Sequence, residues 1–235
     1  MSVNGERCED PSRRVDPARD RVAVDGEAAR LPRPATILLN KPAGVLVTLS
    51  DPGGRRTVVD LIRRAPEGLF PIGRLDRESE GLLLLTNDGD LAFRLMHPRF
   101  GVPRCYRVWV RGEVTADVVR RLERGVLLRE GRTAPAQVAV ARRSARGAVL
   151  RMTLREGRNR EVRRMCEVVG LRVARLHREA FGPLVLAGLA PGAWRHLTDA
   201  EVVTLRRAVG LPDLGLAPDP VKTRLGRGGR GGRRP

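Results

Sequence analysis

The sequence predicts an α+β domain with a large mixed, mainly antiparallel sheet flanked by helices. Short apolar runs of strand length and stretches of helical periodicity follow one another without a regular strand–helix–strand order. No G-x-G-x-x-G motif follows an expected strand, which disfavours a nucleotide-binding fold. The 235 residues suffice for one large domain with appendages and a sizeable core.

The expected strands are compact apolar runs or alternating segments. Residues 82–85 are four consecutive leucines, which is typical of a buried strand. Residues 106–110 alternate strictly, with Tyr106, Val108 and Val110 on one face. Strands are therefore predicted at residues 35–40, 45–49, 82–85, 106–110, 136–141, 148–154 and 171–178.

Helices are predicted where apolar residues recur at helical spacing behind a capping residue. Residues 159–169 show the clearest pattern, with Asn159 at the start and apolar residues at i, i+3, i+4 and i+7 from Val162. Arg160, Arg163 and Arg164 then share another face of this helix. The other expected helices are residues 58–64, a short helix after 86–88 that Pro98 ends, residues 115–124 capped by Thr115, and residues 198–208 opened by a capping box.

The charge balance favours a polyanionic partner. Lys and Arg number 45 against 27 Asp and Glu, which gives a net charge of +18 and a pI of about 11.5. Each neutralised phosphate releases counterions, so nucleic acid is the first partner to consider. Lysine is almost absent, and arginine suits bidentate phosphate contacts, although a GC-rich genome would give the same bias.

The composition argues against several other classes of protein. No apolar stretch approaches the roughly 20 residues needed to cross a bilayer, and the charged first 30 residues are unlike a signal peptide. The three cysteines, Cys8, Cys105 and Cys166, show neither CxxC nor Cys/His ligand spacing. We therefore expect a reduced, metal-free, cytoplasmic protein, and we expect it to be a monomer.

The two ends of the chain differ from its middle. Residues 1–20 carry many charges and few large apolar side chains, so disorder is expected there. Residues 21–34 indicate a strand and a hairpin turn at Asp25-Gly26. Residues 35–212 are expected to form the main domain. Residues 213–235, rich in Pro, Gly and Arg, are expected to be a disordered tail that binds RNA loosely through charge.

Asp76 lies in a charged turn, residues 73–81, just ahead of the leucine strand. Taken alone, an aspartate in such a turn is more often a turn former than a catalytic group. A catalytic carboxylate would have to stay ionised near pH 7, which a nearby cation favours. Arg74, Arg77 or the arginine face of the helix at residues 159–169 could supply that cation.

Two further features have both a structural and a functional interpretation. Tyr106 is the only tyrosine of the chain, and it is either a core residue or a ring that stacks beside an extruded base. The segment REGRNREVRRM, residues 155–165, is either a surface for the RNA backbone or the solvated side of an amphipathic helix. Composition and spacing leave both questions open.

Four sequence blocks together resemble the RNA pseudouridine synthases, in particular the ribosomal branch of small-subunit and large-subunit enzymes. They are LLNKPAGVLVT (38–48), GRLDRESEGLLLLTNDGDLAFRLMHP (73–98), YRVWVRG (106–112) and EGRNREVRRM (156–165). The blocks occur in the family's order and span most of residues 35–210. The resemblance implies the pseudouridine synthase fold for residues 35–212 and a reaction that needs no cofactor and no metal.

The resemblance also implies residue roles. The aspartate of the GRLD motif, catalytic in the family, maps onto Asp76. The tyrosine beside the target base maps onto Tyr106, and the basic residue that pairs with the aspartate maps onto Arg163. The family's reaction breaks the bond between uracil nitrogen and ribose, rotates the base and rejoins it through a carbon. The nucleotide must be flipped into a pocket for this, and the candidate RNA-binding residues are Lys41, Arg74, Arg158, Arg160 and Arg164.

One departure from the family pattern concerns the N-terminus. Many members begin with a small RNA-binding module, of which residues 21–34 resemble only the closing strand, so an incomplete module is expected. The EGRNREVRRM block resembles the large-subunit enzymes more closely, which favours large-subunit rRNA or a pre-ribosomal particle as the partner. The alternatives are a non-catalytic RNA-binding or ribosome-assembly protein, and a base-excising glycosidase that would release free uracil.

Overall fold

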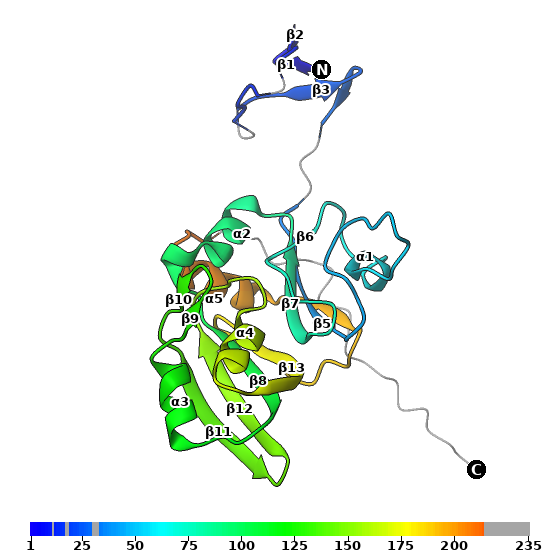
Figure 1. The fold of residues 1–235 in the computed structure, drawn as a ribbon. Coiled ribbons are helices and arrows are strands. Elements are labelled where there is room, and N and C mark those ends of the chain that lie inside the picture. The colour runs from blue at the N-terminus through cyan, green and yellow to red at the C-terminus, as the bar shows by residue number, and fades with distance from the viewer. Residues whose placement is uncertain (11, 17–18, 30–32, 214–235) are drawn as a thin grey trace, which may run out of the picture.

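A nine-stranded sheet carries the larger part of the chain (Figure 1). The structure is a computed structural model that describes residues 1–10, 12–16, 19–29 and 33–213. The strands of this sheet are β5 (Thr36–Lys41), β6 (Phe70–Pro71), β7 (Glu80–Thr86), β8 (Arg104–Arg111), β11 (Gln137–Ser144), β12 (Gly147–Leu154), β13 (Arg172–Phe181), β14 (Leu184–Val185) and β15 (Trp194–His196).

The sheet is mixed and mainly antiparallel. Its order is β11-β12-β8-β13-β7-β5-β15, with β14 beside β13 and β6 beside β7. Paired strands run antiparallel except β13 and β7, which run parallel. The expected α+β fold is therefore confirmed.

The helices cover the sheet in two groups. They are α1 (Val58–Leu61), α2 (Gly89–Met96), α3 (Ala116–Glu123), α4 (Glu161–Val168) and α5 (Asp199–Ala208), with a 3-10 helix at Pro98–Phe100. Helices α3 and α4 share one hydrophobic core with β8, β11 and β12. Helices α2 and α5 share another with β5 and β7. As expected, the side chains of Thr115 and Thr198 cap α3 and α5.

Strands β5 and β7 are buried on both faces, which explains why their sequences are apolar without alternation. Leu38 pairs with Leu84 in the register of the two strands, and both face the core shared with α2 and α5. Leu39 and Leu83 point the opposite way into a third cluster with Val45 and residues of the 57–75 segment. The leucine run therefore fills two cores at once.

The segment at residues 45–49 is not a strand, contrary to the expectation from its apolar sequence. Val45 and Val47 are buried in the third cluster, and Leu46 forms only an isolated bridge with Thr57. Gly44, at φ +85°, turns the chain and donates its amide to the carbonyl of Arg77 at 2.7 Å. The apolar residues thus anchor a loop beside residues 76–79.

The expected start of the helix at Asn159 is also wrong. Helix α4 begins at Glu161, and its N-cap residue is Arg160 in the left-handed region at φ +48°. Pro98 does not follow directly on the end of α2, because that helix ends at Met96 and Pro98 opens the short 3-10 helix. Pro98 fits that position because the first turn of a helix leaves its N–H groups unpaired.

The N-terminal residues form a separate four-stranded sheet, in the order β2-β1-β3-β4. Its strands are β1 (Ser2–Val3), β2 (Glu6–Arg7), β3 (Val22–Val24) and β4 (Glu27–Ala28). Disorder was therefore the wrong expectation for β1 and β2, where Asn4 and Gly5, at φ +55° and +88°, make a hairpin turn. The expected turn at Asp25-Gly26 is confirmed. The domain boundaries stay a prediction, and the expected tail lies outside the described residues beyond Asp213.

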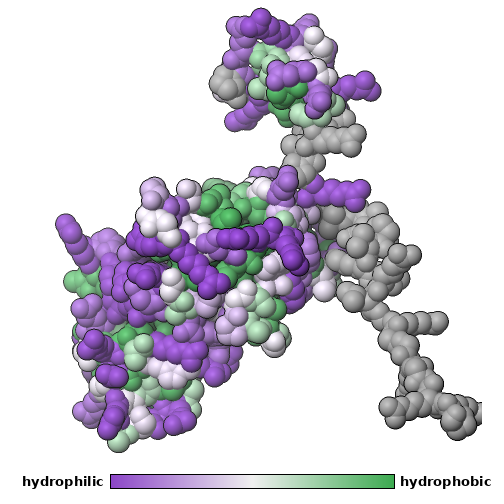
Figure 2. All heavy atoms as spheres, turned by 90° about the vertical axis from the view of Figure 1, so that its right-hand side faces the viewer, coloured by the Kyte–Doolittle hydropathy of each residue, from purple (hydrophilic) through white to green (hydrophobic). Residues whose placement is uncertain are grey.

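One face of the molecule is mostly hydrophilic (Figure 2). Figure 2 shows polar and charged side chains over most of the visible face, with smaller hydrophobic areas between them. Among the helices of the described part of the chain, none has the length and apolar character that crossing a bilayer requires.

Gly81 is the tightest point of the β7 and β13 pairing, and it yields a prediction for stability. Its φ is +104°, and a Cβ there would lie 2.3 Å from the carbonyl oxygen of Arg178. We expect Gly81→Ala to lower the free energy of unfolding by about 3 kcal/mol, because strain at positive φ adds to overpacking. Gly44→Ala, also at positive φ but with no atom within 4 Å of the added Cβ, should cost about 1 kcal/mol. Urea unfolding measures both, and equal losses would contradict the steric argument.

Candidate active site

A cavity of about 940 Å³ opens beside the central strands. It lies where the loop after β5, the turn between β6 and β7, and the segment between β12 and α4 meet. Its lining residues include Leu46, Val47, Arg74, Leu75, Asp76, Arg104, Tyr106, Leu154, Glu156, Arg160, Glu161, Leu176 and Arg178. This volume is within the range of ordinary ligand pockets.

Asp76 is held in this cavity by its neighbours in the turn. Leu75 is buried in the third hydrophobic cluster, and the amide of Ser79 donates to the carbonyl of Asp76 at 3.0 Å. These contacts leave the Asp76 side chain 24% exposed. The carboxylate is therefore reachable from the cavity but only partly hydrated.

Two guanidinium groups approach the same oxygen of this carboxylate. Arg163 Nε lies 3.7 Å and Arg160 Nη1 lies 3.6 Å from Asp76 Oδ2. The Arg163 side chain is 15% exposed, whereas that of Arg160 is 45% exposed and also pairs with Glu78 at 3.2 Å. Arg163 is thus the more desolvated of the two cations, and its attraction to the carboxylate is less screened by water.

Helix α4 positions Arg163. Val162, Met165 and Cys166 bury one side of the helix in its core. Arg163 therefore points toward the turn, where its Nη2 donates to Ser79 Oγ at 3.4 Å. The expected common face of Arg160, Arg163 and Arg164 is only partly formed. Arg164 turns away to a bidentate pair with Glu130, at 2.9 and 2.6 Å.

Tyr106 lies on β8 on the face that the alternation predicts. It shares that face with Val108 and Val110, and its ring packs against both the α3–α4 core and the third cluster. It is half-buried and lines the cavity together with Asp76. The structure thus brings Asp76, Tyr106 and Arg163 to one site from three segments far apart in the sequence.

Two buried arginines in the cavity wall escaped the sequence reasoning. The guanidinium carbons of Arg104 and Arg178 lie 5.0 and 5.1 Å from the centre of the Phe181 ring. Arg178 Nε donates to the carbonyl of Leu82 at 2.7 Å, whereas its buried Nη2 has no hydrogen-bond partner among the described residues. Burial lowers the pKa of Arg104. Arg104 lies two residues before Tyr106 on β8, so the alternation of the strand places both side chains on the same face. This alternation was the sequence signal that could have identified Arg104.

Lys41 does not take the RNA-binding place that we expected. It is fully buried, and its Nζ donates to the carbonyl oxygens of Ser79 at 2.7 Å, Pro42 at 3.0 Å and Arg77 at 3.3 Å. Burial lowers its pKa to about 8. Contact with an RNA phosphate is therefore the wrong expectation, because the ammonium group holds the turn that carries Asp76.

The other expected RNA contacts differ in how free they are. Arg74 is exposed at the cavity. Arg158 pairs with Glu156 at 3.0 Å and donates to the carbonyl oxygens of Gly131 and Arg132 at 2.8 and 2.6 Å. Arg158 therefore braces the segment before α4 against β9 (Leu127–Leu128) and β10 (Gly131–Arg132). RNA binding by Arg74, Arg158, Arg160 and Arg164 stays a prediction.

A pair of carboxyl groups lies next to this brace and also escaped the sequence reasoning. The backbone amide of Arg158 donates to Glu161 Oε2 at 3.2 Å, and the amide of Ala134 donates to Glu156 Oε1 at 2.7 Å. Burial raises the pKa of Glu161 to about 8, and the neighbouring Glu156 acts in the same direction. Glu161 is therefore mostly neutral near pH 7, at the first turn of α4.

The titratable side chains of the described residues do not form a metal centre. No group of three or more His, Cys, Asp or Glu side chains is arranged to hold an ion in that part of the chain. Cys8, Cys105 and Cys166 are free thiols. Burial raises the pKa of Cys166 to about 12, in accord with its place in the core of α4.

Comparisons with known proteins show what this chain is similar to. The family model described as RNA pseudouridylate synthase matches residues 35–168. The chain is 41% identical over 212 residues to an uncharacterized RNA pseudouridine synthase of Aquifex aeolicus, covering 90% of this chain and 85% of that protein. It is 40% identical to ribosomal large subunit pseudouridine synthase B of Bacillus subtilis, covering 88% and 85%. A crystal structure of a pseudouridylate synthase superposes with a TM-score of 0.68 at 28% identity, covering 87% of both chains.

The raised pKa of Glu161 predicts how stability depends on pH. The folded state keeps a proton on this carboxyl up to about pH 8, whereas an unperturbed glutamate releases it near 4.5. The contribution of Glu161 to the free energy of unfolding therefore falls as pH rises from about 4.5 to 8. We expect the Glu161→Gln variant, whose amide cannot ionise, to lack this decline. The melting temperature of the variant should therefore rise relative to that of the parent between pH 5 and 8. Glu167→Gln, an exposed change on the same helix, is the control. A parallel pH profile for Glu161→Gln and the parent would contradict the assignment.

Proposed function

Because the chain belongs to the RNA pseudouridylate synthase family, we propose that it converts a specific uridine of ribosomal RNA to pseudouridine, with Asp76 as the catalytic carboxylate. The observation that carries the proposal is that this carboxylate lines a cavity of about 940 Å³, which Tyr106 also lines, and lies within 4 Å of two guanidinium groups. A carboxylate that only formed a turn would need neither the cavity nor the cations.

The uridine reaches Asp76 by leaving its stack. Flipping a nucleotide out of a helix costs a few kcal/mol, and arginine contacts to the RNA backbone offset that cost. The half-buried ring of Tyr106 then gives the uracil a flat apolar neighbour. Tyr106 thereby holds the base in the cavity while its bond to the sugar is broken.

The reaction is an isomerisation, so atoms and electrons balance within the nucleotide. The bond from C1′ of the ribose to N1 of uracil breaks, the base rotates, and C1′ bonds to C5, which loses its proton while N1 gains one. Asp76 serves this reaction either by adding to the sugar or by removing a proton from it. Both roles require an anionic oxygen, and Arg163 offsets the cost of placing that charge away from water.

The preferred substrate is large-subunit rRNA. The relative from Bacillus subtilis is named for the ribosomal large subunit and shares 40% identity over most of both chains. The net charge of +18 suits a large polyanion. We infer from the same substrate that the protein works in the cytoplasm, on rRNA or a pre-ribosomal particle. We further propose that it acts as a monomer.

The first test removes the charge of the catalytic carboxylate. We expect Asp76→Asn to reduce pseudouridine formation by about 10³-fold or more, with RNA binding kept, when the purified protein is incubated with rRNA from cells that lack it and pseudouridine is mapped chemically. Asp117→Asn, at an exposed aspartate on α3, should modify like the parent. Equal modification by Asp76→Asn and the parent would refute the role of Asp76. Free uracil in the supernatant would instead indicate a glycosidase.

The second test compares the two cations that approach Asp76. Arg163 and Arg160 lie at nearly equal distances from the carboxylate, but Arg163 is three times less exposed. Breaking the more buried pair costs more, so Arg163→Gln should lower kcat on the order of 10²-fold. Arg160→Gln should lower it only a few-fold. Single-turnover rates at saturating protein measure both variants, and equal losses would show that burial does not decide the effect.

A further inference from the structure

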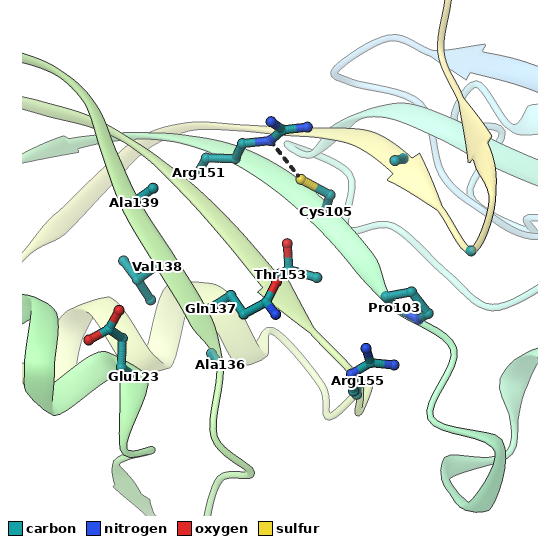
Figure 3. Close-up of a pocket in the computed structure, with 12 residues that line it drawn as sticks. Pro103, Cys105, Glu123, Ala136, Gln137, Val138, Ala139, Arg151, Thr153 and Arg155 are labelled. Atoms are coloured by element: carbon teal, nitrogen blue, oxygen red, sulfur yellow. Dashed lines mark hydrogen bonds between the residues drawn. The ribbon is translucent and has the colours of Figure 1, made fainter.

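The sheet has an open face on the side away from α3 and α4. Within the described residues, no helix covers this side of β11, β12, β8 and β13, and its central side chains Ala139, Arg107 and Arg151 are exposed. The opposite side of the same strands is buried under α3 and α4. Figure 3 shows this open face, with Ala139, Arg151 and Cys105 on its strands.

The strand register gathers arginines on the open face. Arg151 of β12 pairs with Arg107 of β8, and Val149 pairs with Trp109 in the next outward row. On either side of that row, Arg142 of β11 pairs with Val149, and Arg175 of β13 pairs with Trp109. We call Arg107, Arg142, Arg151 and Arg175, together with Arg155 just after β12, the arginine face.

Positive charge exceeds negative charge on this surface. Arg107 and Arg151 share one carboxylate, Glu179, at 2.7 and 3.8 Å. Arg175 pairs with Glu80 at 2.7 Å. Arg142 has no ion pair among the described residues. The arginines that do have a carboxylate remain exposed, so their guanidinium groups keep free donors for an anion.

A groove of about 610 Å³ runs beside these arginines. Small residues of the sheet, Ala139, Thr153 and Ala180, line it together with Arg151 and Arg155. Its lining also includes Gln137 and one carboxylate residue, Glu123 of α3 (Figure 3). Figure 3 shows Arg151 reaching across to Cys105, whose thiol accepts a hydrogen bond from Arg151 Nε at 3.2 Å. The two guanidinium groups outnumber the one carboxylate in this lining, and the small side chains leave room for a phosphodiester backbone close to the sheet.

This groove and the Asp76 cavity are on opposite sides of β8. Tyr106 lines the cavity, whereas its neighbour Cys105 lines the groove, because successive side chains of a strand point to opposite faces. A small stem-loop placed over Asp76 therefore does not reach the arginine face. Contact with both surfaces would require a larger folded RNA, with a second segment that passes behind the sheet.

We propose that the arginine face is a second RNA-binding surface, which holds a segment of the folded rRNA remote from the uridine in the cavity. The inference rests on the proposed function for the identity of the RNA. Charge decides the class of partner, since the face combines excess guanidinium groups with few exposed large apolar side chains. Protein interfaces are anchored by buried apolar and aromatic clusters, whereas phosphate contacts need mainly exposed cations.

The test is the affinity of the full-length protein for a large-subunit rRNA transcript, measured at several salt concentrations. The variant Arg107→Gln/Arg142→Gln/Arg151→Gln should bind 10-fold to 100-fold more weakly, with a salt slope smaller by about 2 to 3, because each lost phosphate contact removes roughly 0.7 to 0.9. The control Arg120→Gln/Arg121→Gln/Arg124→Gln removes the same charge from exposed positions of α3 and its C-cap. It should bind within about 3-fold of the parent. Equal weakening by the two triple variants would overturn the proposal.

Two further measurements separate the inference from folding and from catalysis. Arg107→Lys/Arg142→Lys/Arg151→Lys should keep most of the affinity and the salt slope, because it keeps the charges, whereas a loss as large as with glutamine would overturn the proposal. The maximal rate of pseudouridine formation should stay unchanged in the glutamine variant while the half-saturating RNA concentration rises. If the parent forms no pseudouridine but the glutamine variant still loses affinity, the proposed function fails and the arginine face stands.

Discussion

The organisation of the site depends on the attraction between one carboxylate and one guanidinium, Asp76 and Arg163, across a gap of 3.7 Å. Both side chains are largely shielded, so each would be costly to bury without the other. The two groups belong to different segments, a turn before β7 and a helix after β12. Holding the charges at this distance therefore requires that the turn and the helix each be fixed by contacts of their own.

A buried basic residue fixes the turn, and a buried acidic residue helps to fix the helix. Lys41 is a buried cation that satisfies three carbonyl oxygens on and beside the turn. On the helix side, Glu161 is a buried acid that stays neutral near pH 7, while Arg158 ties the preceding segment to β10. In both cases a titratable residue acts as a structural connector. The groups left for an RNA ligand are the partly exposed ones, Asp76 and Arg160 among them.

Sequence reasoning predicted the elements that depend on local pattern. The buried leucines of β7, the alternation around Tyr106 and the capping box of α5 each carry their own signal, and each is confirmed. The strand predicted at residues 45–49 was wrong. These apolar side chains pack on a core, but the segment has no neighbouring strand to pair with. Residues 1–20 misled because their charged composition indicated disorder, whereas β1 and β2 pair around the turn at Asn4 and Gly5.

The site was predictable only where a motif or a parity rule applied. Asp76, Tyr106 and Arg163 followed from family blocks, and the structure brings them together. The burial of Lys41 was not predictable, because whether a cation faces solvent or three carbonyl oxygens depends on tertiary packing. The same holds for Glu161, an acid inside an arginine-rich segment. Its environment includes Glu156, whose Oε1 accepts a hydrogen bond from the distant amide of Ala134.

The parallel pairing of β7 with β13 has a consequence for how the protein is made. Arg178 and Leu82, joined across this pairing, are 96 positions apart, and such distant contacts form late in folding. A ribosome delivers the chain from its N-terminus at about 5–20 residues per second. The segments that form the first half of the cavity wall therefore leave the ribosome several seconds before β13. If translation stopped before β13, the leucine strand β7 would lack this neighbour along one edge. The active site would then be incomplete.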